Sequence, residues 1–542
     1  MVRQRMPGCL AGRMGGLTMV GAIALLVGTP ALALITSIGQ EGIDARRLHN
    51  APYNLTGSKI AIGQVEIGRP ALFGLDKAGA RNFVVRVSRL FFRNDLARAN
   101  DLVDAHAANV ASVMISQDKY ATGVAPNARL YSAAVGVVRR GGQPEECLAS
   151  QTVALQNGED VRAINFSFGE SLAQDPRPNA VLDGNALLTQ CIDWSHTKHQ
   201  TLYVIAGNQG RGGIPIPTDN FNGMTVANST MVDGVFRKVD FSNLGSEPQL
   251  VVGRPASQES NVGPRRSVSL VAPGTGIAMI NPDGSLTRST GTSFAAPHAT
   301  ATVALLQEFG DRQIRTRQPN WSLDARRPEV SKAVLMNAAD KMKDNGDGLL
   351  LGMTRTVINQ SGRHWLESDA ARDRKIPLDA DLGTGHLNAY RAIQQFAPGQ
   401  HSPEATVPAI GWDYRSVGQG GNHPTVRDYV LAQPLQKDSY LAATLAWNRV
   451  VELQDANRNG LYDLGETFRD RGLNNLDLYL MRAEDSDLRQ AIWSSVSQVD
   501  SVEHIFYPIP ETGRYKLRVV YRDRANEAVQ PYALAWWSVP AR

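Results

Sequence analysis

The most informative stretch of the sequence is Gly291-Thr292-Ser293-Phe294-Ala295-Ala296-Pro297-His298. A helical pattern follows at residues 299–309, so Ser293 lies where a tight turn enters a helix. A serine held in such a place is exposed, and backbone N–H groups of the first helical turn point toward whatever it attacks. Serine is also a common helix N-cap. Taken alone, the position allows Ser293 to be a nucleophile or a helix cap.

Apolar runs and helical patterns alternate through residues 59–396. Residues 59–65, 130–138 and 202–206 are predicted strands, and residues 102–114 form a predicted helix. This alternation predicts an α/β fold with a doubly wound, mostly parallel sheet. In that architecture reactive groups collect at the carboxyl ends of the strands, so we expect the functional residues directly after these runs.

The octapeptide around Ser293 resembles the nucleophile motif G-T-S-x-A-x-P-H of the subtilase family of serine peptidases. Further segments resemble landmarks of the same family, in the family's order. These segments are Gly123-Val124-Ala125-Pro126-Asn127-Ala128, Ile164-Asn165-Phe166-Ser167-Phe168-Gly169, Ala206-Gly207-Asn208, Val271-Ala272-Pro273-Gly274 and Gly383-Thr384-Gly385-His386-Leu387-Asn388. The resemblance covers residues 59–396. It implies the subtilisin-like fold and the activity of a serine endopeptidase.

A serine hydroxyl is a weak nucleophile at neutral pH, so it needs a general base. The family pattern for the base is H-G-T-H-V-A-G, and its best match is His106-Ala107-Ala108-Asn109-Val110-Ala111-Ser112. This segment lies on a helix predicted at residues 101–115. The flanking glycines and the second histidine of the pattern are missing, but His106 aligns with the first histidine of the pattern. The resemblance implies that His106 is the base.

The acid that orients the base departs from the family pattern D-T-G or D-S-G, because this chain reads Val65-Glu66-Ile67-Gly68. Ser-His-Glu triads are chemically competent, since the acid only fixes the imidazole tautomer and stabilises the imidazolium. The alternatives are that Glu66 begins an exposed loop, or that Asp104 or Asp76 supplies the carboxylate. Asp104 lies two residues before His106 and therefore on another face of the predicted helix.

The resemblance also implies an oxyanion hole and a substrate-binding rim. Asn208 is the predicted side-chain donor to the oxyanion, together with the backbone N–H of Ser293. An asparagine in a glycine-containing turn is the alternative. The predicted substrate-binding residues, against which a peptide would lie as an added strand, are Ser167, Phe168, Gly169 and Gly207.

The N-terminus has the pattern of a secretory signal peptide. Arginines precede an apolar run at residues 17–34, which ends in Ala31-Leu32-Ala33. We expect cleavage after Ala33, which leaves residues 34–56 as a short N-terminal extension of a secreted protein, periplasmic or extracellular; an uncleaved membrane anchor is the alternative. The extension is too short for a folding-assisting pro-domain of usual size. We therefore expect folding without one, or with help from the C-terminal region.

Composition excludes few classes of function. The chain has 542 residues, 42% of them hydrophobic and 20% charged, with a formal net charge of +4. This balance is typical of a soluble globular protein without a strongly basic face. We expect protein or peptide substrates, no nucleic-acid partner and a monomer. After signal cleavage only Cys147 and Cys191 remain, and the sequence leaves open whether they form a disulfide or are two buried thiols.

Near Pro398 the alternating strand and helix patterns end, and short alternating runs without a helical period follow. This change predicts a boundary between a peptidase domain at residues 57–398 and a second domain at residues 399–542. Alternating apolar residues there predict a small antiparallel β-sandwich. They are Leu476, Leu478 and Leu480, and Tyr515, Leu517, Val519 and Tyr521. Residues 475–480 and 512–517 resemble the pre-peptidase C-terminal domains of secreted bacterial proteases.

Residues 455–466 read Asp-Ala-Asn-Arg-Asn-Gly-Leu-Tyr-Asp-Leu-Gly-Glu, which matches the EF-hand loop at every ligand position. The pattern predicts a structural Ca²⁺. The expected ligands are Asp455, Asn457, Asn459, the Leu461 carbonyl, Asp463 and Glu466. A polar hairpin turn is the alternative, because the flanking residues look like strands.

Two other hypotheses about the function are alternatives to an active endopeptidase. One is a degenerate relative that keeps the fold and binds peptides without turnover. The other is an unrelated esterase, which would require G-x-S-x-G and the order Ser, acid, His, whereas this chain has the order acid, His, Ser.

Overall fold

The computed structural model describes residues 37–137, 142–208, 215–239, 263–420 and 423–541. The predicted signal peptide and the first residues of the N-terminal extension lie outside this part of the chain. Within the described residues, no helix combines the length and apolar character that crossing a membrane requires.

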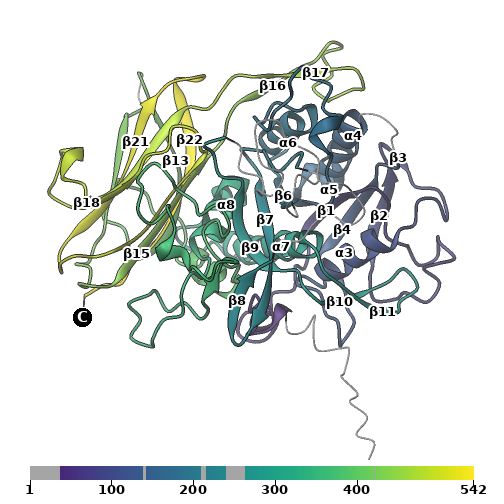
Figure 1. Cartoon of the computed structure of the whole chain (residues 1–542), viewed down its shortest axis with the longest axis horizontal. Coiled ribbons are helices and arrows are strands. Elements are labelled where there is room, and N and C mark those ends of the chain that lie inside the picture. The colour runs from purple at the N-terminus through teal and green to yellow at the C-terminus, as the bar shows by residue number, and fades with distance from the viewer. Residues whose placement is uncertain (1–36, 138–141, 209–214, 240–262, 421–422, 542) are drawn as a thin grey trace, which may run out of the picture.

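A large sheet forms the centre of the first part of the chain (Figure 1). Its strand order is β12-β8-β7-β6-β5-β1-β4-β2-β3, with β9 paired to β7. The strands are β1 (Ala61–Glu66), β2 (Val87–Phe92), β3 (Asp95–Leu96), β4 (Arg129–Ala134), β5 (Val161–Phe166), β6 (Leu202–Ala206), β7 (Met224–Val232), β8 (Val235–Lys238), β9 (Val268–Pro273) and β12 (Val357–Ile358). The central strands β4, β1, β5, β6 and β7 pair in parallel. The predicted doubly wound sheet is confirmed.

Helices cover both faces of this sheet, so its central strands are buried throughout. The helices are α2 (Arg46–His49), α3 (Ala105–Ile115), α4 (Gln143–Ala154), α5 (Gln156–Glu159), α6 (Leu187–Lys198), α7 (Thr292–Arg315), α8 (Pro328–Asn337) and α9 (Ala389–Phe396). Helices α3 and α7 share one apolar core with Ile62 and Leu130, whereas α4 and α6 share another with Val65 and Ile164. A hairpin of β10 (Ile277–Ile280) and β11 (Leu286–Ser289) lies beside α3.

The N-terminal extension is part of the main core. Ile38, Ile43 and Leu48 are fully buried in the cluster that contains α7. The amide of Ala389 donates to the Ile43 carbonyl at 2.7 Å, which ties this segment to the start of α9.

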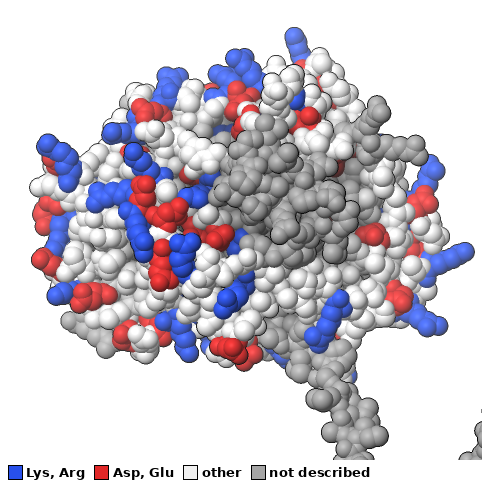
Figure 2. All heavy atoms as spheres, in the orientation of Figure 1, with Lys and Arg blue, Asp and Glu red and all other residues white. Residues whose placement is uncertain are grey.

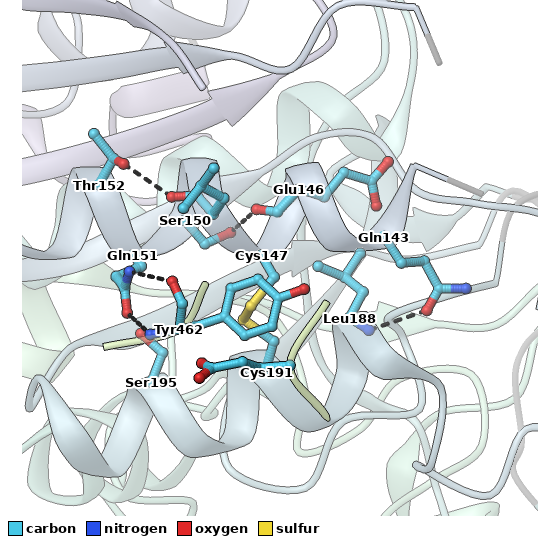
Figure 3. Close-up of a disulfide and its surroundings, with 12 residues drawn as sticks. Gln143, Glu146, Cys147, Ser150, Gln151, Thr152, Leu188, Cys191, Ser195 and Tyr462 are labelled. Carbon is cyan, nitrogen blue, oxygen red and sulfur yellow. Dashed lines mark hydrogen bonds between the residues drawn. A yellow bond between two sulfur atoms is a disulfide. The ribbon is translucent and has the colours of Figure 1, made fainter. Parts of the chain in front are cut away.

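The two cysteines left open by the sequence form a disulfide. Cys147 on α4 and Cys191 on α6 have their Cα atoms 5.8 Å apart, and both residues are fully buried (Figure 3). The bond joins the two helices that cover one face of the sheet. Its loop of 44 residues is long enough for a substantial restriction of the unfolded chain.

Two antiparallel sheets form the C-terminal region, as the alternating pattern predicts. One contains β13 (Ile410–Gly418), β22 (Val529–Trp537), β15 (Tyr440–Trp447) and β20 (Val502–Pro508), and the other contains β14 (Val426–Val430), β21 (Tyr515–Asp523), β18 (Asn475–Arg482) and β19 (Trp493–Ser495). The seven alternating residues named from the sequence are all at most 3% exposed in the core between these sheets. Strands β15 and β22 pack against α8, which joins the sandwich to the α/β part.

A two-stranded hairpin reaches from the sandwich to the helices of the first part. Strands β16 (Val451–Gln454) and β17 (Thr467–Asp470) lie against α6 (Figure 1). The ring centroids of Trp194 and Phe468 are 5.6 Å apart. Gln151 on α4 donates to the Tyr462 carbonyl and accepts from the Tyr462 amide. The hairpin therefore contacts both disulfide-linked helices.

A buried ion pair fixes the chain just before the first strand of this hairpin. Arg449 is 1% exposed, and its Nε lies 2.7 Å from the carboxylate of the fully buried Asp193 on α6. Asp193 also accepts hydrogen bonds from the amides of Phe221 and Asn222. Removal of one partner from such a pair leaves an uncompensated buried charge.

We predict that Arg449→Met lowers the free energy of unfolding by about 3–5 kcal/mol, because it removes the guanidinium that contacts the buried Asp193 carboxylate directly. Chemical denaturation measures the change. The control is Arg471→Met, which removes a half-exposed pair with Glu452 at the same hairpin and should cost at most about 1 kcal/mol. Equal small losses in both variants would contradict the anchoring role.

Candidate active site

Glu66 is the last residue of β1 and places its carboxylate at the carboxyl end of the sheet. Strand β1 lies between β4 and β5, so the residue is only 2% exposed. Oxygen Oε2 is 3.3 Å from Nδ1 of His106, and Oε1 has no hydrogen-bond partner among the described residues. The structure thus brings together the acid and base that the sequence predicts, and it excludes an exposed loop position for Glu66.

Both alternative carboxylates are engaged elsewhere. Asp104 is the N-cap of α3 and accepts from the amide of Ala107 at 2.9 Å. Asp76 forms a two-point ion pair with the guanidinium of buried Arg69, at 2.7 and 2.8 Å. Gly68 is required for the close approach of these segments, because a Cβ there would lie 2.3 Å from Cβ of Asp104.

His106 lies in the first turn of α3, with 39% of its side chain exposed. Its ring centroid is 5.5 Å from that of Phe294, the residue after Ser293. Burial lowers the pKa of His106, but the charge and hydrogen bonding of Glu66, with a smaller effect of Asp104, raise it more. The net result is a pKa above the ordinary value. The imidazole is therefore a stronger base than a free histidine.

The departures from the family's histidine motif are accommodated by other hydrogen bonds. Gln64 donates to the Ala107 carbonyl at 2.9 Å from the neighbouring strand β1. Asn109, in the place of the second histidine, donates to the Ile280 carbonyl at 3.0 Å. Helix α3 begins at Ala105 rather than at residue 101, because Asp104 has extended backbone angles and caps it.

Ser293 is the second residue of α7 and does not cap it. The N-cap is Gly291, and the cap makes no side-chain hydrogen bond. The Ser293 hydroxyl donates to the Ser167 carbonyl at 3.1 Å, and the Ser167 hydroxyl donates to the Ser293 carbonyl at 2.8 Å. The start of α7 is thereby fixed against the segment that follows β5.

Asn208 follows β6 at the same edge of the sheet. Phe166 pairs with Ile205 in the parallel ladder, so β5 and β6 end at the same edge of the sheet and the segments after them begin side by side. Asn208 is 2% exposed, and the Gly207 amide donates to the Val226 carbonyl at 2.9 Å. Asn208 and the Ser167 segment therefore lie on neighbouring strand ends.

The other predicted substrate residues continue the segment after β5. Phe168 is 7% exposed and stacks on Phe166 with ring centroids 5.0 Å apart. Gly169 is half-buried. The segment thus has an apolar side chain turned inward and a more accessible backbone beyond it.

Comparison with known proteins decides the family. The model of the subtilase family matches residues 74–354. The chain belongs to the subtilase family. It is 23% identical to thermitase from Thermoactinomyces vulgaris over 289 residues, which cover 53% of this chain and 74% of thermitase. Alkaline elastase YaB from Bacillus sp. (strain YaB) is 24% identical over 200 residues, 37% of this chain and 41% of that protein.

Among solved structures, the subtilase is similar to the prenylagaramide maturation protease PagA, with a TM-score of 0.41 and 20% identity over 65% of this chain and 97% of that one. MycP1 with its N-terminal propeptide removed gives a TM-score of 0.38 and 15% identity, over 65% and 93% of the two chains. As a member of its family, the subtilase is a serine endopeptidase that acts on protein substrates.

One residue near the site, Asn165, belongs to a family-like segment but had no predicted role. Asn165 is fully buried near the end of β5, donates to the Ser167 hydroxyl at 2.8 Å and accepts from the Thr300 hydroxyl at 3.3 Å. It fixes the rotamer of the serine that contacts Ser293. The available signal was a polar residue near the end of an otherwise largely apolar strand.

The predicted calcium loop of the subtilase lies between β16 and β17. Its oxygen-bearing side chains converge: the amides of Asn457 and Asn459 both donate to Asp463, and the Asp455 carboxylate accepts from the Gly460 amide at 2.7 Å. Gly460 has φ +77°, which favours glycine. No cluster of three or more His, Cys, Asp or Glu residues suited to a metal occurs in the described part of the chain. Oxygen donors from asparagines and a carbonyl would therefore have to complete this set.

We predict that the His106 imidazole titrates above its ordinary pKa in the native protein and below it in Glu66→Gln, where burial acts without the carboxylate. Proton NMR of the histidine Cε1–H signals against pH measures both values. His401, whose pKa is lowered by burial, is an internal reference that should not move. An unchanged His106 titration in Glu66→Gln would contradict the pairing.

Proposed function

We propose that this subtilase is an exported endopeptidase that cleaves peptide bonds through an acyl-enzyme, with Glu66, His106 and Ser293 as its triad. The observation that carries the proposal is the 3.3 Å contact between the buried Glu66 carboxylate and Nδ1 of His106. With Nδ1–H donating to Glu66, the other ring nitrogen Nε2 is left as the proton acceptor.

The chemistry follows from these roles. The Ser293 hydroxyl turns from the Ser167 carbonyl toward Nε2 of His106, gives up its proton and attacks the substrate carbonyl carbon. Asn208 and the Ser293 backbone N–H stabilise the oxyanion that forms. His106 then donates the proton to the leaving amine, and a water molecule activated by His106 hydrolyses the ester. Glu66 stabilises the imidazolium in both steps.

The substrate peptide would lie along Ser167, Phe168 and Gly169 as an added strand, with Gly207 on the neighbouring strand end. The half-buried backbone at Gly169 is compatible with such pairing. On the face shown in Figure 2, positive and negative side chains are interspersed. We expect no nucleic-acid partner, and we expect a monomer.

Export is supported by the signal-peptide pattern at residues 1–33 and by the buried disulfide. Disulfides persist in oxidising compartments such as the periplasm and the extracellular space. The packing of residues 37–56 into the main core supports their retention in the mature protein.

The test of the proposed function is intact-mass analysis after treatment with a fluorophosphonate probe. Native protein should gain one probe per chain, and Ser293→Ala should gain none, because the activated serine is the only expected target. Circular dichroism verifies that the variant is folded. A folded native protein that takes up no probe would contradict the proposal. It would favour the alternative, a family member that binds peptides without cleaving them.

We also propose that the loop at residues 455–466 binds a structural Ca²⁺. The support is the EF-hand spacing of oxygen donors, with side chains of Asp455, Asn457, Asn459, Asp463 and Glu466 and the carbonyl of Leu461. Since the loop connects two strands that pack on α6, a bound ion would stiffen the contact between the sandwich and the α/β part.

We predict that chelation of Ca²⁺ lowers the thermal unfolding midpoint of the native protein, because an ion that binds only the folded state stabilises it by mass action. In Glu466→Gln the midpoint should no longer respond to chelator. The control Glu452→Gln, on β16 outside the loop, should respond as the native protein does. Calorimetry measures all three, and a native midpoint unaffected by chelator would contradict the calcium site.

A further inference from the structure

The helix that carries Ser293 lacks one of its regular backbone hydrogen bonds. In an α-helix each carbonyl accepts from the amide four residues later along the chain. For Ser293 that residue is Pro297, which lies inside α7 and has no amide proton. Ser293 is half-buried, so we expect its carbonyl to find a partner outside the helix.

The Ser167 hydroxyl supplies that partner. It donates to the Ser293 carbonyl at 2.8 Å from the segment that follows β5, and Ser167 is only 3% exposed. In the opposite direction, the Ser293 hydroxyl donates to the Ser167 carbonyl at 3.1 Å. Two hydrogen bonds thus join Ser293 to the predicted substrate-binding segment, and one of them replaces the bond that Pro297 removes.

Asn165 sets the direction in which the Ser167 hydroxyl donates. Nδ2 of Asn165 donates to Ser167 Oγ at 2.8 Å, so this oxygen accepts there and its proton is left for the Ser293 carbonyl. The Thr300 hydroxyl lies 3.3 Å from Asn165 Oδ1 and 3.3 Å from the Ala296 carbonyl, both of which are acceptors. Asn165 and Thr300 are fully buried, so these contacts fix the orientation of the amide.

The hydrogen-bonded chain begins and ends on the same helix. Thr300 is seven residues after Ser293, about two helical turns, and therefore lies on the same face of α7. Strand β5, which carries Asn165, contacts this helix. The first turn of α7 is thus tied to the sheet at two places. That turn also carries the Ser293 backbone N–H, which has no acceptor within the helix.

We propose that Ser167 and Asn165 are positioning residues for Ser293. They replace the helical hydrogen bond that Pro297 removes and thereby hold the first turn of α7 in place for the reaction. The inference rests on the proposed role of Ser293 as the nucleophile. Since this turn carries both the reacting hydroxyl and the N–H that faces the oxyanion, a small displacement would misplace both groups at once.

Acylation by a fluorophosphonate and cleavage of a peptide substrate test the inference. Ser167→Ala should slow acylation by about ten- to hundredfold, because the first turn of α7 is no longer held at the reacting position. It should lower kcat and leave KM close to the native value, since the backbone that pairs with the peptide is unchanged. Asn165→Leu, which removes the amide at similar volume, should also lower kcat. The control Thr302→Val removes another buried hydroxyl of α7, which donates to the His298 carbonyl at 2.7 Å, and should keep the native rate.

Pro297→Ala is the compensating variant. It restores an amide four residues after Ser293, so the Ser293 carbonyl regains a helical partner and depends less on the Ser167 hydroxyl. The loss of acylation rate caused by Ser167→Ala should therefore be about threefold or more smaller in the Pro297→Ala background. Equal losses in the two backgrounds would make the effect of Ser167 a general destabilisation and overturn the inference.

Thermal denaturation of the same proteins separates this inference from the proposed function. The fall in Tm caused by Ser167→Ala should be smaller in the Pro297→Ala background, whether or not Ser293 reacts. A native protein that is not labelled but shows this coupling overturns the proposed function and supports the hydrogen-bond replacement. Labelling of Ser167→Ala at the native rate overturns the positioning role alone. A raised KM with native kcat would assign the Ser167 hydroxyl to substrate binding and would also overturn it.

Discussion

The arrangement of the candidate site depends on the burial of Glu66 at the end of the central strand β1. Strand β1 is enclosed by β4 and β5, so a polar side chain at its last position needs a hydrogen-bond partner within the protein. The partner is Nδ1 of His106, at 3.3 Å, on a helix whose start is fixed by the Asp104 cap. The ring in turn lies beside the first turn of α7, which carries Ser293. The proposed acid, base and nucleophile thus come from three separate elements that meet at one edge of the sheet.

Much of this arrangement could be predicted from the sequence, because each candidate site residue lies at or near an end of a regular element with a recognisable local pattern. Glu66 ends β1, Asn208 lies two residues after β6, and Ser293 is the second residue of α7. The parallel sheet brings the carboxyl ends of its strands to one edge. The start of α3 was wrong by four residues, since extended backbone angles at Asp104 replace a first helical turn. Helix periodicity alone does not contain that information.

Contacts between distant segments could not be derived in the same way. The disulfide depends on the packing of α4 against α6, which sets the 5.8 Å separation of the two Cα atoms. The ion pair of Arg449 with Asp193 joins residues that lie far apart in the sequence and share no motif. The hairpin at residues 451–470 was expected as part of a sandwich, yet it lies on α6 and connects the two halves of the chain.

The most direct test of the account is the rate at which a fluorophosphonate acylates Ser293 in the native protein, in Glu66→Gln and in Asp104→Asn. In the proposed triad Glu66 acts through His106, so Glu66→Gln should slow the reaction by about 10³–10⁴-fold. Asp104→Asn preserves an equally good helix cap and should stay close to the native rate. A native rate in Glu66→Gln, with the protein folded, would contradict the claim that this glutamate activates the catalytic serine.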